Sequence, residues 1–286
     1  MRDVSPLDIE ALQSNLQTQF FGIGDRLLYF PTIESTNSFL MHLAYERPEE
    51  GLVVLTDSQT AGKGRQGRRW VDVPGRNVLL SILLRPLFLP HLLVMITSLA
   101  VVDAIVDICQ VAAAIKWPND VLVEDHKVAG VLIETSHDSS GRMAAVVGIG
   151  VNVNGGVEDL AEHTSMQVPL TVTATTLESA CGHSVSRELF IARLLQYIEK
   201  SYFELQQEMA NLHVIGTETT ESASHLIRER WGGQLATLGS PIRVQQGNSV
   251  LSGIAEDVNE SGELLLRSHS GELVSITWGD VEYSAR

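Results

Sequence analysis

Hydrophobic and polar residues follow two different periods along the chain, and these periods predict a mixture of helices and strands. Apolar residues recur every three or four positions in several segments, which is typical of helices. The predicted helices are residues 7–20, 34–46, 92–114 and 186–208. Short apolar runs bounded by turn residues predict strands. The predicted strands lie in residues 26–33, 51–57, 77–86, 114–136 and 142–154, and segment 114–136 contains three strands joined by two turns.

The order of these elements predicts the fold class. Antiparallel hairpins with helices before and after them favour an α+β domain whose helices cover one face of the sheet. Near residue 235 the pattern changes to short strands separated by glycine-containing turns, which is typical of a small β-barrel. We therefore predict two domains, residues 1–234 and residues 235–286.

Composition narrows the classes of function. The chain has 20 basic and 35 acidic residues and a net charge of −15, which argues against binding to nucleic acids or anionic membranes. The most apolar stretch, residues 92–102, is too short to span a bilayer and predicts a buried helix. Cys109 and Cys181 are too far apart in sequence to suggest a disulfide framework or a metal site. With no signal-peptide pattern at the N-terminus, we expect a cytoplasmic protein.

Residues 60–70, TAGKGRQGRRW, combine three glycines with four cations. The glycines match the dinucleotide-binding spacing, but a strand follows them where that motif needs a helix. They also resemble a Walker A motif, but Arg68 and Arg69 stand where Lys and Ser or Thr are required. A glycine-jointed cationic loop suits a mobile clamp over a polyphosphate or acyl-phosphate. A solvated surface turn is the alternative.

Four other short motifs carry groups that suit a polar ligand. They are ESTN (residues 34–37), KWPND (116–120), KVAG (127–130) and GIGVNVN (148–154). Hydroxyls and an amide at a helix N-terminus can bind an anion or a small polar group, and hairpin-linked strands can present Lys116 and Lys127 to one site. Each motif taken singly also has an ordinary explanation, as a helix N-cap, a hairpin turn or a strand end.

Taken together and in this order, the five motifs resemble those of the biotin protein ligase family, from about residue 27 to the C-terminal region. The resemblance implies a mixed sheet with helices, as in class II synthetase-like catalytic domains, followed by an SH3-like barrel. No N-terminal DNA-binding domain of the kind found in bifunctional members is visible, so we expect a monofunctional ligase rather than a repressor. The implied reaction uses ATP, biotin and Mg²⁺ to form biotinyl-5′-AMP. A lysine of a biotin carboxyl carrier domain, as in acetyl-CoA carboxylase, then accepts the biotinyl group.

The resemblance also assigns site residues. It implies that Lys127 and Arg65 are catalytic. The implied biotin contacts are Ser35, Thr36, Asn37, Gln59, Gly62, Arg65 and Lys127. The implied ATP or adenylate contacts are Lys63, Arg68, Trp70, Asn119, Asp120 and Asn152. Trp70 would cover or stack on adenine, Lys63 stands where many members have arginine, and Asp120 would position Mg²⁺ or the acceptor lysine, or only cap the turn. Arg187 matches a family position near the loops, or is a helix-surface residue.

Two alternatives remain at this point. A lipoate ligase shares the fold and the adenylation chemistry, although its expected motifs differ from GRQGR with KWPND. A non-catalytic regulator that binds biotin or a nucleotide would be expected to lack Lys127 or Arg65, or to carry a DNA-binding domain. The sequence leaves open the general base for the acceptor lysine, the role of the barrel and whether the protein forms a homodimer.

Overall fold

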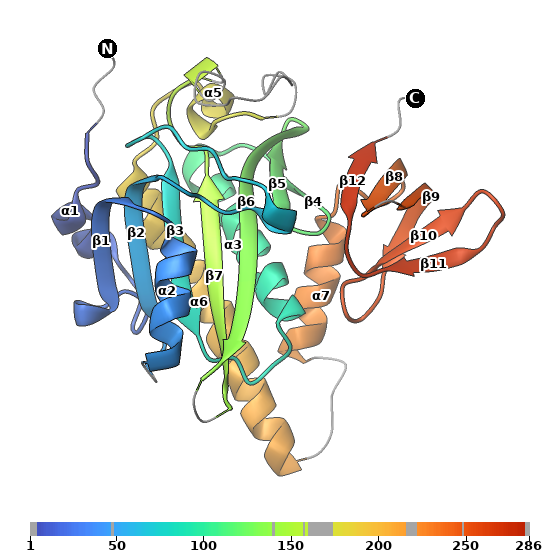
Figure 1. The fold of residues 1–286 in the computed structure, drawn as a ribbon, viewed down its shortest axis with the longest axis horizontal. Coiled ribbons are helices and arrows are strands. Elements are labelled where there is room, and N and C mark those ends of the chain that lie inside the picture. The colour runs from blue at the N-terminus through green and yellow to red at the C-terminus, as the bar shows by residue number, and fades with distance from the viewer. Residues whose placement is uncertain are drawn as a thin grey trace.

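The chain folds into a large mixed sheet with helices and a smaller antiparallel sheet beside it (Figure 1). A computed structural model describes residues 5–46, 49–138, 141–156, 158–159, 174–215, 222–247 and 249–283. The helices are α1 (Ile9–Asn15), α2 (Thr36–Glu46), α3 (His91–Cys109), α5 (Leu177–Cys181), α6 (Arg187–Ile215) and α7 (Ala223–Gly233). The strands of the large sheet are β1 (Leu27–Ile33), β2 (Leu52–Gln59), β3 (Val78–Leu84), β4 (Ala114–Lys116), β5 (Asp120–Val123), β6 (His126–His137) and β7 (Met143–Val151).

The large sheet is mixed, as the family resemblance implied. Its strand order is β1-β2-β3-β7-β6-β5-β4. Strand β1 pairs with β2 in parallel, and every other neighbouring pair is antiparallel. The hairpins predicted in residues 114–136 are strands β4, β5 and β6. This pairing brings the start of β5 and the first half of β6 to the same end of the sheet.

Helices cover both faces of the sheet, and the expectation that they cover one face is wrong. Helix α2 packs on one face, where its Leu40 and Ala44 join Leu52 and Val54 in a small apolar cluster. Helices α3 and α6 lie on the other face, which carries the main core (Figure 1). The first half of strand β2, residues 52–55, is buried on both sides, which explains why its sequence is continuously apolar instead of alternating.

Helix α3 is the central element of the main core. It ends at Cys109, earlier than predicted, because Gln110 adopts a left-handed conformation with φ of 58°. By length and composition alone it could cross a membrane, yet 72% of its apolar window is buried inside the protein. The predicted buried helix over residues 92–102 is therefore confirmed as part of a core helix.

The second sheet forms the C-terminal SH3-like barrel. Its strands are β8 (Pro241–Gln246), β9 (Ser249–Val258), β10 (Leu264–Ser268), β11 (Leu273–Ile276) and β12 (Asp280–Tyr283), in the order β11-β10-β9-β8-β12. Trp117 fastens the barrel to the large sheet, because its Nε1 donates to the carbonyl of Gly262 at 2.9 Å and its backbone N–H donates to Thr237 Oγ1 at 2.9 Å. The domain boundary near residue 235 stays a prediction.

Candidate active site

A cavity of about 450 Å³ opens between the large sheet, the glycine-basic loop (residues 60–70) and the barrel. Most of the predicted site residues line it. These are Ser35, Thr36, Asn37, Gln59, Lys63, Arg65, Arg68, Trp70, Asn119, Asp120 and Lys127. Gly62 and Asn152 are the predicted residues that do not line it. Segments that are far apart in sequence therefore meet at one place.

The start of helix α2 supplies a polar floor to the cavity. Ser35, Thr36 and Asn37 are each at most 3% exposed. The backbone N–H of Thr36 donates to Gln59 Oε1 at 2.9 Å, and the Thr36 hydroxyl lies 3.2 Å from the same oxygen. Ser81 Oγ, on strand β3, lies 2.6 Å from Asn37 Oδ1 and 2.7 Å from Thr36 Oγ1. Hydrogen bonds within the protein thus fix the orientation of these groups before any ligand binds.

The glycine-basic loop is folded back on itself. Lys63 and Arg69 form a bridge between its two arms, and the N–H of Trp70 donates to the carbonyl of Gly62 at 3.0 Å. A Cβ at Gly62 would lie 2.7 Å from the carbonyl oxygen of Trp70, so only glycine fits without a shift. The turn at the tip passes through positive φ at Gln66 (56°) and Gly67 (74°). Gly62 therefore shapes the loop instead of lining the cavity.

The predicted catalytic cations, Lys127 on strand β6 and Arg65 on the glycine-basic loop, contact the adjacent residues Asp120 and Asn119. Lys127 Nζ lies 2.6 Å from Asp120 Oδ1, across the β5–β6 pair. Arg65 Nη1 donates to Asn119 Oδ1 at 2.8 Å. Burial lowers the pKa of Arg65, and the Asp120 carboxylate opposes that change. Arginine remains charged under all ordinary conditions, so the cavity holds a partly desolvated positive charge beside an ion pair.

Trp70 lies on two glycines of the sheet. A Cβ at Gly150 on β7 would come within 2.5 Å of the indole, and one at Gly130 on β6 within 3.2 Å. Lys127 Nζ is 5.6 Å from the centre of a Trp70 ring. The indole Nε1 is buried without a hydrogen-bond partner among the described residues. Backbone glycines thus make room for a flat group in the cavity wall.

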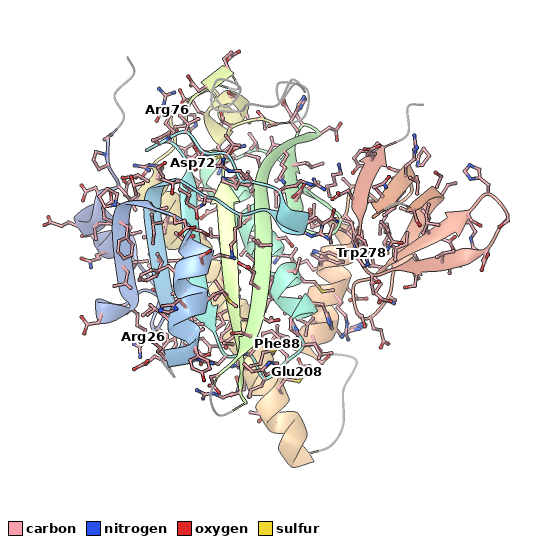
Figure 2. The ribbon with its side chains drawn as sticks, viewed as in Figure 1. Arg26, Asp72, Arg76, Phe88, Glu208 and Trp278 are labelled. Carbon is pink, nitrogen blue, oxygen red and sulfur yellow. The ribbon has the colours of Figure 1, made fainter. Side chains whose placement is uncertain are left out.

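The barrel contributes part of the cavity wall. Figure 2 shows Trp278 on the side of the barrel that faces the large sheet, and the residues that follow it, Gly279 and Asp280, line the cavity. The Asp280 carboxylate forms an ion pair with Arg68 of the loop. Lys116 Nζ lies 5.3 Å from the ring centre of Tyr283, and burial lowers the pKa of Lys116 while the Asp120 carboxylate opposes that change.

Comparisons with known proteins agree with this geometry. The family model described as biotin/lipoate A/B protein ligase family matches residues 29–154, and the biotin protein ligase C-terminal domain matches residues 237–283. A biotin–[acetyl-CoA-carboxylase] ligase of Paracoccus denitrificans is 36% identical over 226 residues, covering 77% of this chain and 86% of the relative. The chain belongs to the biotin protein ligase family.

Further relatives and structures extend the match. The bifunctional ligase/repressor BirA of Bacillus subtilis is 29% identical over 263 residues, covering 91% of this chain and 74% of the relative. The structure of a biotin protein ligase from Aquifex aeolicus in complex with biotin and ATP has a TM-score of 0.72 at 24% identity, covering 91% of this chain and 100% of that one. This likeness shows that the catalytic fold is shared.

Asn152 lies within the matched family region but outside the cavity. Its side chain is 5% exposed, accepts a hydrogen bond from Asn77 Nδ2 at 3.0 Å and donates to the carbonyl of Thr175 at 3.2 Å. The backbone N–H of Leu177 donates to the carbonyl of Asn152. These contacts hold the segment after residue 173 against the end of β7, and a nucleotide contact by Asn152 stays a prediction.

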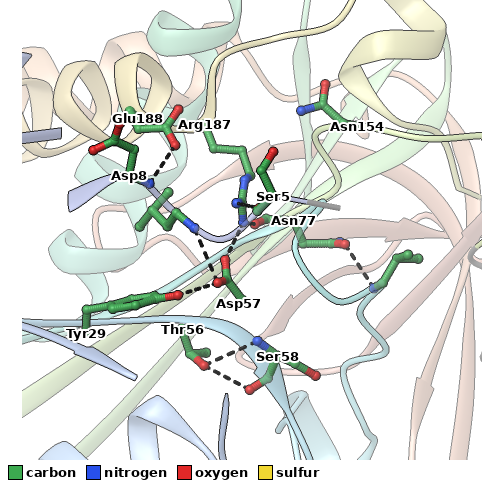
Figure 3. A network of polar contacts seen from close by, with 12 residues as sticks. Ser5, Asp8, Tyr29, Thr56, Asp57, Ser58, Asn77, Asn154, Arg187 and Glu188 are labelled. Atoms are coloured by element: carbon green, nitrogen blue, oxygen red, sulfur yellow. Dashed lines mark hydrogen bonds and ion pairs between the residues drawn. The ribbon is translucent and has the colours of Figure 1, made fainter. Parts of the chain in front are cut away.

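Arg187 lies away from the cavity and is not a helix-surface residue. It begins helix α6 and is 6% exposed. Figure 3 shows it in a buried network in which its guanidinium contacts Asp57 Oδ1 at 2.7 Å and the carbonyl of Ser5 at 2.8 Å. The hydroxyl of Tyr29 donates to the other oxygen of Asp57. Arg187 thus ties the N-terminal segment to strand β2.

Sequence reasoning missed several polar residues that hold or complete the site. Ser81 orients the floor, Glu134 contacts Asn37 from strand β6, and Asp280 contacts the loop from the barrel. The only sequence signal was a polar residue inside an otherwise apolar strand, at Ser81 in the segment NVLLSILLRP. Asp280 and Glu134 are distant from the loop in sequence, so no local pattern indicates that they contact it.

Proposed function

We propose that the protein uses ATP to activate biotin as biotinyl-5′-AMP and transfers the biotinyl group to a lysine of a biotin carboxyl carrier domain, such as that of acetyl-CoA carboxylase. One observation carries the proposal. A single cavity joins a buried polar floor, suited to a ureido ring, to the cations of the glycine-basic loop and strands β4–β6. The matching relatives are named for the same activity.

The first step requires charge neutralisation and alignment. The biotin carboxylate attacks the α-phosphorus of ATP, a P–O bond forms, and the bond to pyrophosphate breaks. A carboxylate is already ionised at neutral pH, so no general base is needed. We assign Lys127 to the α-phosphate and the carboxylate, where both reactants bring negative charge, and Arg65 to a position over the intermediate. Lys127 would then release Asp120 and contact the substrate instead.

The residues fit a magnesium ion that is carried by the substrate phosphates. Mg²⁺ is commonly held by one or two carboxylates together with phosphate oxygens. Asp120 lines the cavity, and the described residues contain no group of three or more His, Cys, Asp or Glu side chains that could hold a metal by themselves. Asp120 would therefore contact the ion, whose chemistry when bound is to neutralise the leaving pyrophosphate.

The second step needs access for a protein substrate. The ε-amino group of the acceptor lysine attacks the carbonyl carbon of the mixed anhydride, an amide bond forms, and AMP leaves with the bonding electron pair. The attacking nitrogen loses one proton to water in this step. Arg65 and Arg68, on the glycine-basic loop, would hold the adenylate while the barrel and the loop leave one side of the cavity open. Trp70 would cover adenine or stack on it, as the family resemblance implied.

Biotin and lipoate make different demands on the floor of the cavity. The ureido ring of biotin needs paired donors and acceptors, which Thr36, Asn37 and Gln59 can supply, whereas a dithiolane ring needs an apolar pocket. The test is incubation with Mg-ATP, a carrier domain and either biotin or lipoate, with mass spectrometry of the carrier. We expect only biotin to be attached, and attachment of lipoate alone would refute the proposal.

Lys127→Ala tests the assigned catalytic role. Lys127 is partly exposed, and its ion pair with Asp120 contributes little stability, so the variant should fold normally. We expect it to release no pyrophosphate from ATP and biotin. Normal pyrophosphate release by a folded Lys127→Ala protein would remove Lys127 from the mechanism.

The remaining expectations about partners are proposals as well. A net charge of −15 supports the absence of nucleic-acid and anionic-membrane partners, and a cytoplasmic location would give access to carrier proteins. We propose that residues 1–234 and 235–286 are the catalytic domain and the barrel domain. Sedimentation equilibrium with and without biotin and ATP would decide between a monomer and a homodimer.

A further inference from the structure

Glu134 is a carboxylate just behind the cavity wall that the proposed mechanism does not use. It lies on strand β6, seven residues after Lys127. One of its oxygens accepts from Asn37 Nδ2 at 2.9 Å, and the other lies 3.1 Å from Lys63 Nζ. Its side chain is 28% exposed, so these two contacts are partly shielded from water. Glu134 therefore contacts the floor and the glycine-basic loop at the same time.

The contact with Asn37 fixes the polarity of the floor. An ionised carboxylate only accepts hydrogen bonds, so it requires the NH₂ end of the Asn37 amide to face Glu134. The carbonyl end, Oδ1, then faces Ser81 Oγ at 2.6 Å. Ser81 also contacts Thr36, and Thr36 contacts Gln59. Glu134 thus begins a chain of oriented groups that crosses the floor of the cavity.

The contact with Lys63 fastens the loop. Lys63 follows Gly62 and forms a bridge with Arg69, so it stands where the two arms of the loop leave the sheet. Its side chain is 42% exposed, and its ammonium group is drawn down to strand β6 by Glu134. An attachment at this point limits how far the base of the loop can lift away from the floor.

We propose that Glu134 is a positioning residue that couples the order of the glycine-basic loop to the order of the biotin-binding floor. This inference rests on the proposed function. The same Glu134 carboxylate contacts both Asn37 and Lys63. A ligand that orders the Asn37 side chain therefore also stabilises the Glu134 conformation that binds Lys63. Closure of the loop in turn restrains the carboxylate that orients Asn37. Neither effect requires Glu134 to touch a substrate.

Glu134→Gln tests the proposal with a nearly isosteric side chain. The amide cannot accept from both neighbours, because its NH₂ group must face either Asn37 or Lys63, which are both donors. We expect the KM for biotin to rise about tenfold or more, as for loss of a hydrogen bond to a charged group, while kcat and the KM for ATP change less than about threefold. Glu256→Gln is the matched control, because it removes a carboxylate from an exposed pair with Arg267 on the barrel.

Lys63→Met separates the two contacts of Glu134. It removes the loop attachment and leaves the bond between Glu134 and Asn37 in place. Saturating biotin should protect the wild-type loop from an arginine-specific protease, and this protection should be at least about threefold weaker in both variants. In the double variant Glu134→Gln/Lys63→Met, the free-energy change derived from the KM for biotin should be smaller than the sum of the changes in the two single variants.

The outcomes separate this inference from the proposed function. An active wild type, combined with a biotin KM for Glu134→Gln within about twofold of wild type, would overturn the role of Glu134. Undiminished biotin protection of the loop in Lys63→Met would overturn the coupling. A wild type without biotin-dependent pyrophosphate release would instead refute the proposed function. Thermal unfolding of each variant shows whether it is folded.

Discussion

Replacing Gly148 with alanine tests whether the Asn37 amide has to lie where the structure places it. Gly148 is on strand β7, paired with Ser81 on one side and with Leu132 on the other. A Cβ at this position would lie 2.2 Å from Asn37 Oδ1 and 2.8 Å from its Cγ. The strand is held by hydrogen bonds on both sides, so the amide must move instead of the backbone.

The structure gives a magnitude for this displacement. Moving the amide breaks its contacts with Ser81 Oγ, at 2.6 Å, and with the Glu134 carboxylate, at 2.9 Å. A neutral hydrogen bond contributes about 0.5–1.5 kcal/mol, and one to a charged group about 1.5–3 kcal/mol. The combined loss of about 2–4.5 kcal/mol corresponds to a biotin Kd that is roughly 30-fold to 2,000-fold weaker, if the floor binds biotin as proposed.

Isothermal titration with biotin alone measures this effect, and Gly150→Ala is its control. Gly150 lies two residues along the same strand, and the added methyl there meets the Trp70 indole instead of Asn37. We expect the control to keep a biotin Kd within about threefold of wild type while binding the adenylate more weakly. A folded Gly148→Ala protein with a biotin Kd within about threefold of wild type would refute the assigned role of Asn37.

Three further predictions concern the supports of the site. Arg187→Met leaves the buried Asp57 carboxylate without its cation, so the protein should lose roughly 3–5 kcal/mol and its Tm in calorimetry should fall by about 6–15 °C. Asp280→Ala removes a partly exposed pair with Arg68, so Tm should stay within a few degrees of wild type. An arginine-specific protease should cut the loop of this variant up to about fivefold faster, and unchanged cleavage would show that the barrel does not hold the loop. Burial and the hydrogen bond to Asp57 raise the pKa of Tyr29 to about 12, above about 10 in an unfolded chain. The stability that the neutral phenol contributes is complete below pH of about 10 and is lost as the pH rises toward 12, so Tyr29→Phe should flatten the fall of Tm over that interval.

The sequence was sufficient to predict the strands and the boundaries of the cationic loop. Those features are local, because a strand or turn is encoded by neighbouring residues. The meeting of Lys127 with Arg65 in one site was implied by the family resemblance, and both residues line the cavity. The hairpins of residues 114–136 also fix their own pairing, which brings Asp120 beside Lys127. Short sequence motifs therefore identified the residues that line the cavity better than they identified the residues that contact and orient them.

The sequence could not predict the contacts that orient the site, because they join distant segments. Arg68 meets an aspartate 212 positions away, and Asn37 meets Glu134 97 positions away. Glu134 falls in the more exposed second half of strand β6, where a carboxylate needs no special explanation. The burial of Arg187 could not be predicted either, because a charged residue in the first turn of a helix is usually exposed. Arg187 is buried by contacts with strand β2 and the N-terminal segment, which are distant in sequence.

The cations of the cavity already have partners in an acidic protein, and this arrangement bears on how it can bind a polyphosphate. Lys63 contacts Glu134, Arg68 contacts Asp280 and Lys127 contacts Asp120. Each pair is partly exposed, so each contributes little stability and can be exchanged at small cost. The same pairs hold the long side chains near the cavity, which reduces the conformational entropy that ligand binding would otherwise remove. A triphosphate carries more charge than Asp120 or Asp280, so it can displace these two carboxylates from Lys127 and Arg68. The carboxylates thus keep the cavity ordered without blocking it, and Asp120, once released from Lys127, becomes free to meet Mg²⁺ as proposed.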